Sequence, residues 1–183
     1  MLIQRKSTMR LPWVTFLFPV LSGCCIFYPA SPPTSQLTVT IRLQQDSCSS
    51  RTPKQSLEIV IANNSNQTIA ILGRGWISTG IFHEWQAIVS YNDTLRMIAS
   101  GDFFDKRRLP NSRDYRIVEP DSTYKFTYEF DLSRLLGSLR NSTNTMYGWY
   151  SVALTYHDDF PNNCRAVKGT LISNKQRFTY VSD

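Results

Sequence analysis

Histidine is scarce in this chain, with two residues in 183, and the four cysteines form no Cys-x-x-Cys pair. A zinc site therefore has few ligands to draw on. No Gly-x-Ser-x-Gly elbow, Walker loop or dinucleotide-binding fingerprint is present. Charged residues make up only 19% of the chain and aromatic residues 13%, which excludes a disordered chain. We predict a protein that is not an enzyme and that needs no cofactor or metal.

A long hydrophobic run is also missing. The apolar stretch 11–21 is too short to cross a membrane, which takes about 20 apolar residues. It follows a start with three basic residues and no acidic one, and it precedes the small residues Ser22 and Gly23. This is the layout of a secretory signal peptide. We therefore predict that residues 1–23 are a signal peptide.

The segment Leu21-Ser22-Gly23-Cys24 resembles the lipobox of bacterial lipoproteins. In these proteins a small residue precedes a cysteine that is acylated and becomes the new N-terminus. The resemblance implies that Cys24 carries a lipid anchor. Residue 25 is a cysteine, not the aspartate that keeps lipoproteins of enteric bacteria at the inner membrane. The resemblance thus favours the outer membrane or the cell surface.

Two alternatives to the lipoprotein remain open. One is an ordinary cleaved signal with a fully secreted product. The other is a eukaryotic secreted protein with four Asn-x-Ser/Thr sites, at Asn63, Asn66, Asn92 and Asn141. Loops rich in Asn, Ser and Thr also generate such sites by chance, so the bacterial lipoprotein is favoured.

Removal of the signal peptide changes the charge of the chain. Its formal net charge is +6, but the leader takes away three basic residues and no acid. The mature chain then has 17 basic against 14 acidic residues, a net charge of +3. This balance is ordinary, and we predict no nucleic-acid partner.

Residues 24–36 form the predicted lipidated cysteine and a proline-rich tether, with prolines at 29, 32 and 33. About a dozen extended residues reach roughly 35–40 Å. The tether would hold the following domain, residues 37–183, close to its membrane.

Apolar and polar residues alternate along most of the segment 37–183, which is typical of half-buried strands. The clearest strand is 123–130, where four aromatic residues alternate with polar ones; we predict that this stripe packs inside a sheet. Asp131 is predicted to cap a short helix that ends near Gly137. Further strands are predicted at 37–44, 56–62, 68–72, 86–91, 95–100, 115–118, 150–156, 166–172 and 176–181.

Short strands, evenly spaced turns and one brief helix predict an all-β antiparallel sandwich of about seven to nine strands. The order resembles bacterial immunoglobulin-like domains: an Asn/Ser turn after a strand, a Pro-Asp-Ser turn before an aromatic strand, and a final hairpin after a Tyr-rich strand. The Cys–Trp–Cys core of antibody domains is absent. Trp76, Trp85 and Trp149 are candidates for core bulk.

With Cys24 acylated, an exported chain permits disulfides among the other cysteines. We rank Cys48–Cys164 first, although simple strand counting places these two at opposite ends of a sandwich. Cys25 would emerge at the same end as Cys164.

A basic segment spans residues 105–116 and is a candidate anion-binding loop for lipid headgroups, surface polysaccharide or an acidic partner. The alternative, which we favour, is a solvated loop between strands. The cations are Lys106, Arg107, Arg108, Arg113 and Arg116.

Three functions compete. The first is a non-enzymatic binding module for an unknown envelope protein or polysaccharide. The second, by analogy of fold alone, is a protease inhibitor that presents loop 109–113, with Arg108 or Arg113 entering the protease. The third is an envelope-glycan enzyme that uses His157 and Asp159. His83-Glu84 lacks the second histidine of a metalloprotease motif, because residue 87 is alanine.

Overall fold

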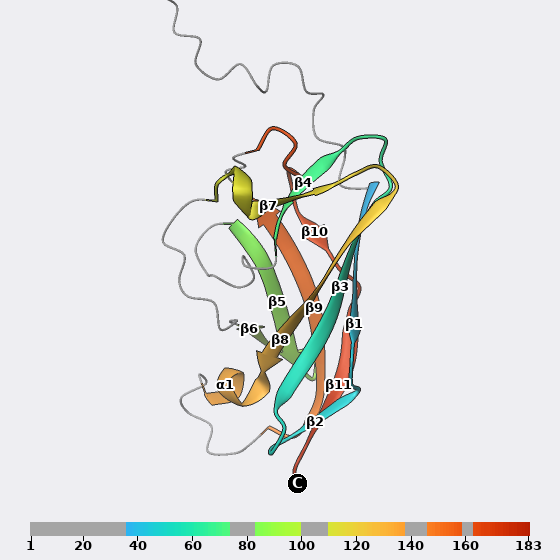
Figure 1. Cartoon of the computed structure of the whole chain (residues 1–183). Helices are drawn as coiled ribbons and strands as arrows, with labels where there is room; N and C mark the ends of the chain where they lie inside the picture. The colour runs from blue at the N-terminus through green and yellow to red at the C-terminus, as the bar shows by residue number, and fades with distance from the viewer. Residues whose placement is uncertain (1–35, 74–82, 100–109, 138–145, 159–162) are drawn as a thin grey trace, which may run out of the picture.

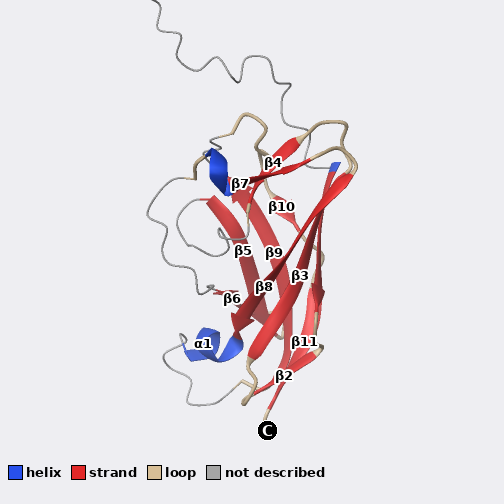
Figure 2. Cartoon of the chain, in the orientation of Figure 1, coloured by secondary structure: helices blue, strands red, loops and turns tan. Residues whose placement is uncertain are grey.

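The computed structural model describes residues 36–73, 83–99, 110–137, 146–158 and 163–183 (Figure 1). More than half of this part of the chain is in strands, and the rest is mainly turns and loops (Figure 2). The strands are β1 (Leu37–Leu43), β2 (Ser47–Ser49), β3 (Lys54–Asn63), β4 (Ile69–Leu72), β5 (His83–Tyr91), β6 (Leu95–Ala99), β7 (Tyr115–Val118), β8 (Ser122–Asp131), β9 (Gly148–Asp158), β10 (Leu171–Ile172) and β11 (Gln176–Val181). A 3₁₀ turn, η3 (Ser112–Asp114), precedes β7, and helix α1 (Leu132–Gly137) follows β8.

Two sheets pack face to face and enclose the core (Figure 1). The small sheet has the order β1-β3-β8, and the large sheet has the order β2-β11-β9-β5-β6, with β10 also on β9. The pairs are antiparallel, except that β2 runs parallel to β11. The predicted all-β sandwich is confirmed.

The strand order is that of an immunoglobulin-like domain. In chain order, β1, β3 and β8 take the places of strands A, B and E, while β5, β6, β9 and β11 take those of C, C′, F and G. Strand β7 has the sequence position of strand D but pairs with β4 in a separate two-stranded sheet. Near the start of β9, the Tyr150 hydroxyl donates to the carbonyl of Met146 at 2.6 Å, as in the tyrosine corner of these domains.

The predicted alternation decides which side chains enter the core. On β8, Tyr128 and Phe130 are buried, and Tyr124 and Phe126 are half-buried against the same cluster. Phe130 meets Phe178 of the large sheet edge to face, with ring centroids 6.1 Å apart. The aromatic stripe therefore packs inside the sandwich, as predicted, because burial of apolar surface is the main gain in folding.

The cap of helix α1 is also as predicted. The Asp131 carboxylate accepts hydrogen bonds from the backbone N–H groups of Ser133 at 2.9 Å and Arg134 at 3.3 Å. These bonds satisfy donors that the first turn of a helix leaves unpaired. Within the described residues no helix is long and apolar enough to span a membrane.

Two buried side chains join the β4–β7 sheet to the sandwich. The Asn63 amide nitrogen donates to the carbonyls of Gln67, Val118 and Glu119, at 2.8, 3.0 and 3.1 Å. The indole nitrogen of Trp85 donates to the Leu72 carbonyl at 2.8 Å. Since Asn63 is fully buried, its side chain belongs to the fold and is closed to glycosylation.

A bulge between β10 and β11, at the edge of the large sheet, links the two sheets. Strands β10 and β11 lie on the same side of β9, but their registers differ by one residue, which places a bulge at residues 173–175. The Asn174 side chain accepts from the Ile41 N–H at 2.7 Å and donates to the Ile41 carbonyl at 3.1 Å. It thereby connects β1 of the small sheet with the edge of the large one.

The predicted Cys48–Cys164 disulfide is wrong: both cysteines are free thiols. Cys48 lies opposite Tyr180, at the Gly148 end of β9. Cys164 is two residues from the bridge between Ala166 and Ala70, and the chain that follows it enters β10, which pairs with the Tyr156 end of β9. Since β9 has 11 residues at about 3.3 Å each, roughly 30 Å separates the two thiols, and a disulfide needs Cα atoms about 6 Å apart.

The predicted strand 166–172 is much shorter in the structure. Only Leu171 and Ile172 pair with β9, and Ala166 makes an isolated bridge to β4. Gly169, with a φ of 97°, interrupts the extended backbone between these two contacts.

Candidate functional site

The outer face of the large sheet carries an exposed aromatic side chain, Trp149. On β9 the residues Tyr150, Val152 and Leu154 point into the core, so Trp149 and Ser151 point to the outside. The indole ring is 62% exposed. The expectation that Trp149 supplies core bulk is therefore wrong, whereas Trp85 is fully buried as expected; Trp76 lies outside the described residues.

The turn between β5 and β6 folds back over this face. Asn92 and Asp93 have φ angles of 46° and 59°, the left-handed conformation that Asn and Asp tolerate in tight hairpin turns. The Asn92 N–H donates to the Trp149 carbonyl at 3.1 Å. The Asp93 carboxylate consequently lies above β9, where it accepts a hydrogen bond from the Ser151 hydroxyl at 3.0 Å.

Two cations from the next strand region meet the same carboxylate. Lys175, in the bulge, donates to one oxygen of Asp93, and a guanidinium nitrogen of Arg177 lies 3.3 Å from the other. The hydrogen bond from Lys175, followed by that from Ser151, lowers the pKa of Asp93 below its usual range. Asp93 is therefore a charged, fixed acceptor that orients both cations.

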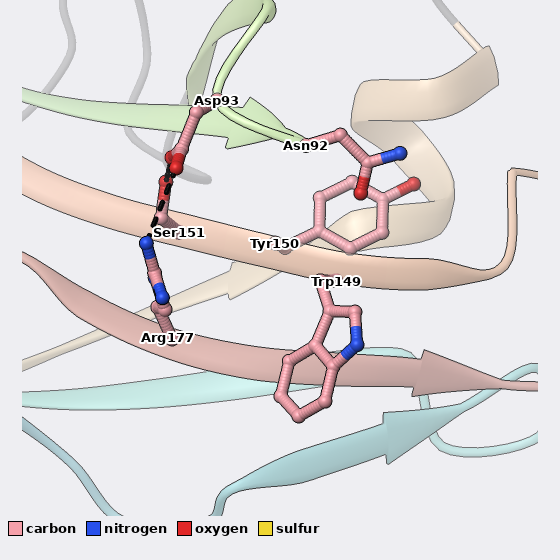
Figure 3. Close-up of a pocket in the computed structure, with 6 residues that line it drawn as sticks. All are labelled: Asn92, Asp93, Trp149, Tyr150, Ser151 and Arg177. Atoms are coloured by element: carbon pink, nitrogen blue, oxygen red, sulfur yellow. Dashed lines mark hydrogen bonds and ion pairs between the residues drawn. The ribbon is translucent and has the colours of Figure 1, made fainter.

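Asp93, Ser151 and Arg177 lie on the wall of an open pocket of about 360 Å³ on the sheet surface (Figure 3). The indole of Trp149 extends from β9 toward β11, on the side where Arg177 reaches up to Asp93. The pocket is lined by Asn92, Asp93, Trp149, Tyr150, Ser151 and Arg177. It combines one aromatic surface with several hydrogen-bonding groups, a composition typical of a binding site for a small polar ligand.

The register extends the polar part of this site across four strands. Arg177, Ser151, Ser90 and Arg96 are successive cross-strand neighbours on the outer face. Arg96 adds a third exposed cation to Lys175 and Arg177, against the single carboxylate of Asp93. The described part of the pocket region therefore has an excess of positive charge.

A row of aliphatic side chains lies beside this polar row. Ile98, Ile88 and Ala153 are direct cross-strand neighbours one pleat further along the sheet. Ile98 is 55% exposed and Ile172, on β10, is 69% exposed. The outer face of the large sheet thus presents both apolar and cationic surface to solvent.

The predicted basic loop is only partly within the described residues. Lys106, Arg107 and Arg108 lie outside them. Arg113 stands exposed on η3, where Asn111 and Asp114 form a capping box, and Arg116 stands exposed on β7. The anion-binding role of this segment and its role as a protease bait both stay predictions.

The predicted His157–Asp158–Asp159 cluster divides between two sides of a sheet. His157 points outward on β9, where its Nδ1 lies 3.2 Å from the Thr170 hydroxyl. Asp158 points inward and is buried, and it accepts a hydrogen bond from the Tyr115 hydroxyl at 2.6 Å. Asp159 lies outside the described residues. Within the described ranges, no three His, Cys, Asp or Glu side chains are grouped so that they could hold a metal ion.

The sequence-based reasoning missed the pocket, although one signal for it was present. In the run GWYSVALTY the buried set begins at Tyr150, so strict alternation places Trp149 on the outer face. Nothing in the local sequence indicated that Asp93, Lys175 and Arg177 would meet, since more than 80 residues separate the acid from the cations.

No protein-family model matches the chain, and a search of curated proteins finds no match. The predicted leader, the lipidation site Cys24 and the tether up to residue 35 all lie outside the described residues.

Proposed function

We propose that this protein is a lipid-anchored, non-enzymatic binding module of the bacterial cell envelope. The lipobox-like segment ending at Cys24 supports the anchor, and the proline-rich stretch after it supports a short tether. The exported domain would work through a surface, with its ligand bound at the outer face of the large sheet.

The exposed Trp149 carries this proposal. A large aromatic side chain on the surface, placed beside fixed polar groups, is the usual anchor of a binding site. In the described part of the molecule the small sheet has no exposed large hydrophobic side chain, so the two outer faces offer different surfaces to a partner.

Site-specific photo-crosslinking in the producing bacterium tests the proposal on the full-length chain. A photoreactive residue at Thr179, the cross-strand neighbour of Trp149, should capture an envelope component. The matched control is Thr40, a half-buried threonine on the outer face of the small sheet. Trp149→Ala should abolish the adduct at position 179.

Equal crosslinking at positions 179 and 40, or an adduct that Trp149→Ala leaves unchanged, would show that this face is not the binding surface. The anchor is tested separately by mass spectrometry of the mature N-terminus. A diacylglyceryl group on Cys24 is expected, and an unmodified N-terminus at another residue would remove the lipoprotein assignment.

A further inference from the structure

The ligand class can be read from the chemistry of the pocket, if the outer face is the binding surface as proposed above. We infer that the pocket around Trp149 and Arg177 binds an acidic saccharide, a pyranose chain that bears carboxylate groups.

The aromatic part of the pocket suits a sugar ring. One face of a pyranose presents C–H groups, which pack on the electron-rich face of an indole ring. Trp149 is 62% exposed and extends from the rigid strand β9, so a flat, partly apolar ring can lie on it without a rearrangement. The hydroxyl groups at the ring edge would then face Asn92 and Asp93 on the turn.

The polar part of the pocket suits an anion. Arg177 has five N–H donors and Lys175 has three, and their side chains are 70% and 50% exposed while both contact Asp93. Asp93 neutralises one of the two charges and holds both side chains in place. A guanidinium fixed in this way can bind a carboxylate with paired hydrogen bonds.

The row of cross-strand neighbours from Arg177 to Arg96 suggests how a chain-like ligand would lie on the sheet, namely across the strands. Arg96 and Arg177 stand three strand spacings apart, about 14 Å, with Ser90 and Ser151 between them. Because Ser90 and Ser151 are buried, an oligosaccharide that lies across the strands would meet chiefly the cation at each end of the row. Repeated carboxylates along the chain match this spacing of charges better than a single small anion does.

The test uses the lipidated chain that begins at Cys24, in detergent micelles and with fluorinated tryptophan, so that each of its three tryptophans, Trp76, Trp85 and Trp149, gives its own ¹⁹F resonance. The probes are hexasaccharides of hyaluronan, alginate and polygalacturonate, each paired with its carboxyl-reduced, neutral form. At about 10 mM, a concentration that reveals weak binding, at least one acidic probe should shift the Trp149 resonance. Its neutral counterpart should bind at least about tenfold more weakly.

Variants assign the effect to the two parts of the site. Because Trp149→Ala and Trp149→Tyr remove the ¹⁹F reporter, the affinities of all variants are measured by calorimetric titration with the same probes. Trp149→Ala should lower the affinity for the acidic probe about tenfold, and Trp149→Tyr should restore most of it. Arg177→Gln should lower the affinity for the acidic probe and leave the residual binding of the neutral probe unchanged. Arg42→Gln, which removes the same charge from the small sheet, should have no effect.

Three results would overturn the inference. They are no shift of the Trp149 resonance with any probe, equal binding of the acidic and neutral forms, and an equal effect of Arg42→Gln and Arg177→Gln. If the crosslink at position 179 depends on Trp149 while the saccharides fail, the surface binds an envelope component other than an acidic saccharide. In that case the proposed function stands and the ligand class assigned here is wrong.

Discussion

The two sheets of the sandwich have similar inner faces and very different outer faces. The outer side of β1-β3-β8 carries mainly threonines and charged residues that alternate with the core positions. The outer side of the large sheet carries Trp149, Ile98, Ile172 and Val181, all among the exposed large hydrophobic residues of the described chain. Both sheets bury an apolar inner face in the core. Core formation alone therefore does not explain why the outer face of the large sheet also carries apolar side chains.

In a sandwich, the residues at outward positions are the ones that indicate function. Inward positions must be apolar in any such fold, whereas an exposed tryptophan has a cost in solubility that a threonine would avoid. Trp85 and Trp149 illustrate this within one sheet, since the first is fully buried and the second is largely exposed. The predictions below test this contrast between core and surface.

The largest effect is expected from Trp85→Ala. The ring is fully buried, lies 4.6 Å from Tyr156 by ring centroids, and bonds the Leu72 carbonyl. The substitution should lower the free energy of unfolding by about 3–5 kcal/mol, measured by chemical denaturation. Trp85→Phe should cost less, because it keeps part of the ring volume. A loss below about 1 kcal/mol would mean that this position is not part of a packed core.

The next largest effect is expected from Asn63→Ala at the end of β3. The substitution leaves the buried carbonyl of Val118 and the N–H of Ser65 without their partner. The free energy of unfolding should fall by about 2–3 kcal/mol. Asn66→Ala, at an exposed position of the same turn, should change it by less than about 0.5 kcal/mol. Equal effects at the two positions would contradict the role of the Asn63 side chain in joining the β4–β7 sheet to the sandwich.

A smaller loss is expected where Asn174 joins the two sheets. Asn174→Ala removes both hydrogen bonds to Ile41 and should cost about 1 kcal/mol, because the site is only part-buried. Asn174→Asp keeps the acceptor for the Ile41 N–H but loses the donor, so its stability should be intermediate. Hydrogen exchange at the Ile41 amide measures the effect locally, and unchanged protection in Asn174→Ala would refute the link.

Trp149→Ala should change the free energy of unfolding by less than about 0.5 kcal/mol, because the side chain is largely exposed. This is the counterpart of Trp85→Ala in the same sheet. Thermal denaturation of the two variants side by side decides the comparison. If Trp149→Ala were as destabilising as Trp85→Ala, the residue would be structural, and its exposure would no longer indicate binding.

The smallest effect concerns the titration of Asp93. Its pKa is lowered, chiefly by the hydrogen bond from Lys175, so its charged form favours the folded state. The contribution is present at neutral pH, above the usual range of a carboxyl group, and is lost as the pH falls through the lowered pKa. A ¹³C titration of the carboxyl group should show the shift, and Lys175→Gln should move the pKa back toward its ordinary value. An unchanged pKa in this variant would exclude the Lys175 contact.

Most of the fold followed from local patterns. The period of two along 123–130 and the cap at Asp131 each depend on neighbouring residues, and each is confirmed. The disulfide between Cys48 and Cys164 failed because it depends on which end of the sandwich each loop occupies. The separate pairing of β4 with β7 is likewise a long-range contact that no local pattern announces.

The pocket belongs to the same class of long-range features. Alternation along β9 was enough to place Trp149 outside, but the hairpin turn had to fold over β9 before Asp93 could meet Lys175 and Arg177. That meeting depends on the strand order β11-β9-β5, which brings residues far apart in the chain into one row.

From the order of its residues alone, this chain specifies strands, turns and the side of each strand that enters a core, because these follow from backbone geometry and apolar burial over a few residues. Which surface side chains become neighbours depends on strand pairing, whose partners in β2 and β11 lie 132 residues apart in the chain. The charge around Trp149, and with it the chemistry of the surface, arises only when the strands β11, β9 and β5 of the large sheet are assembled.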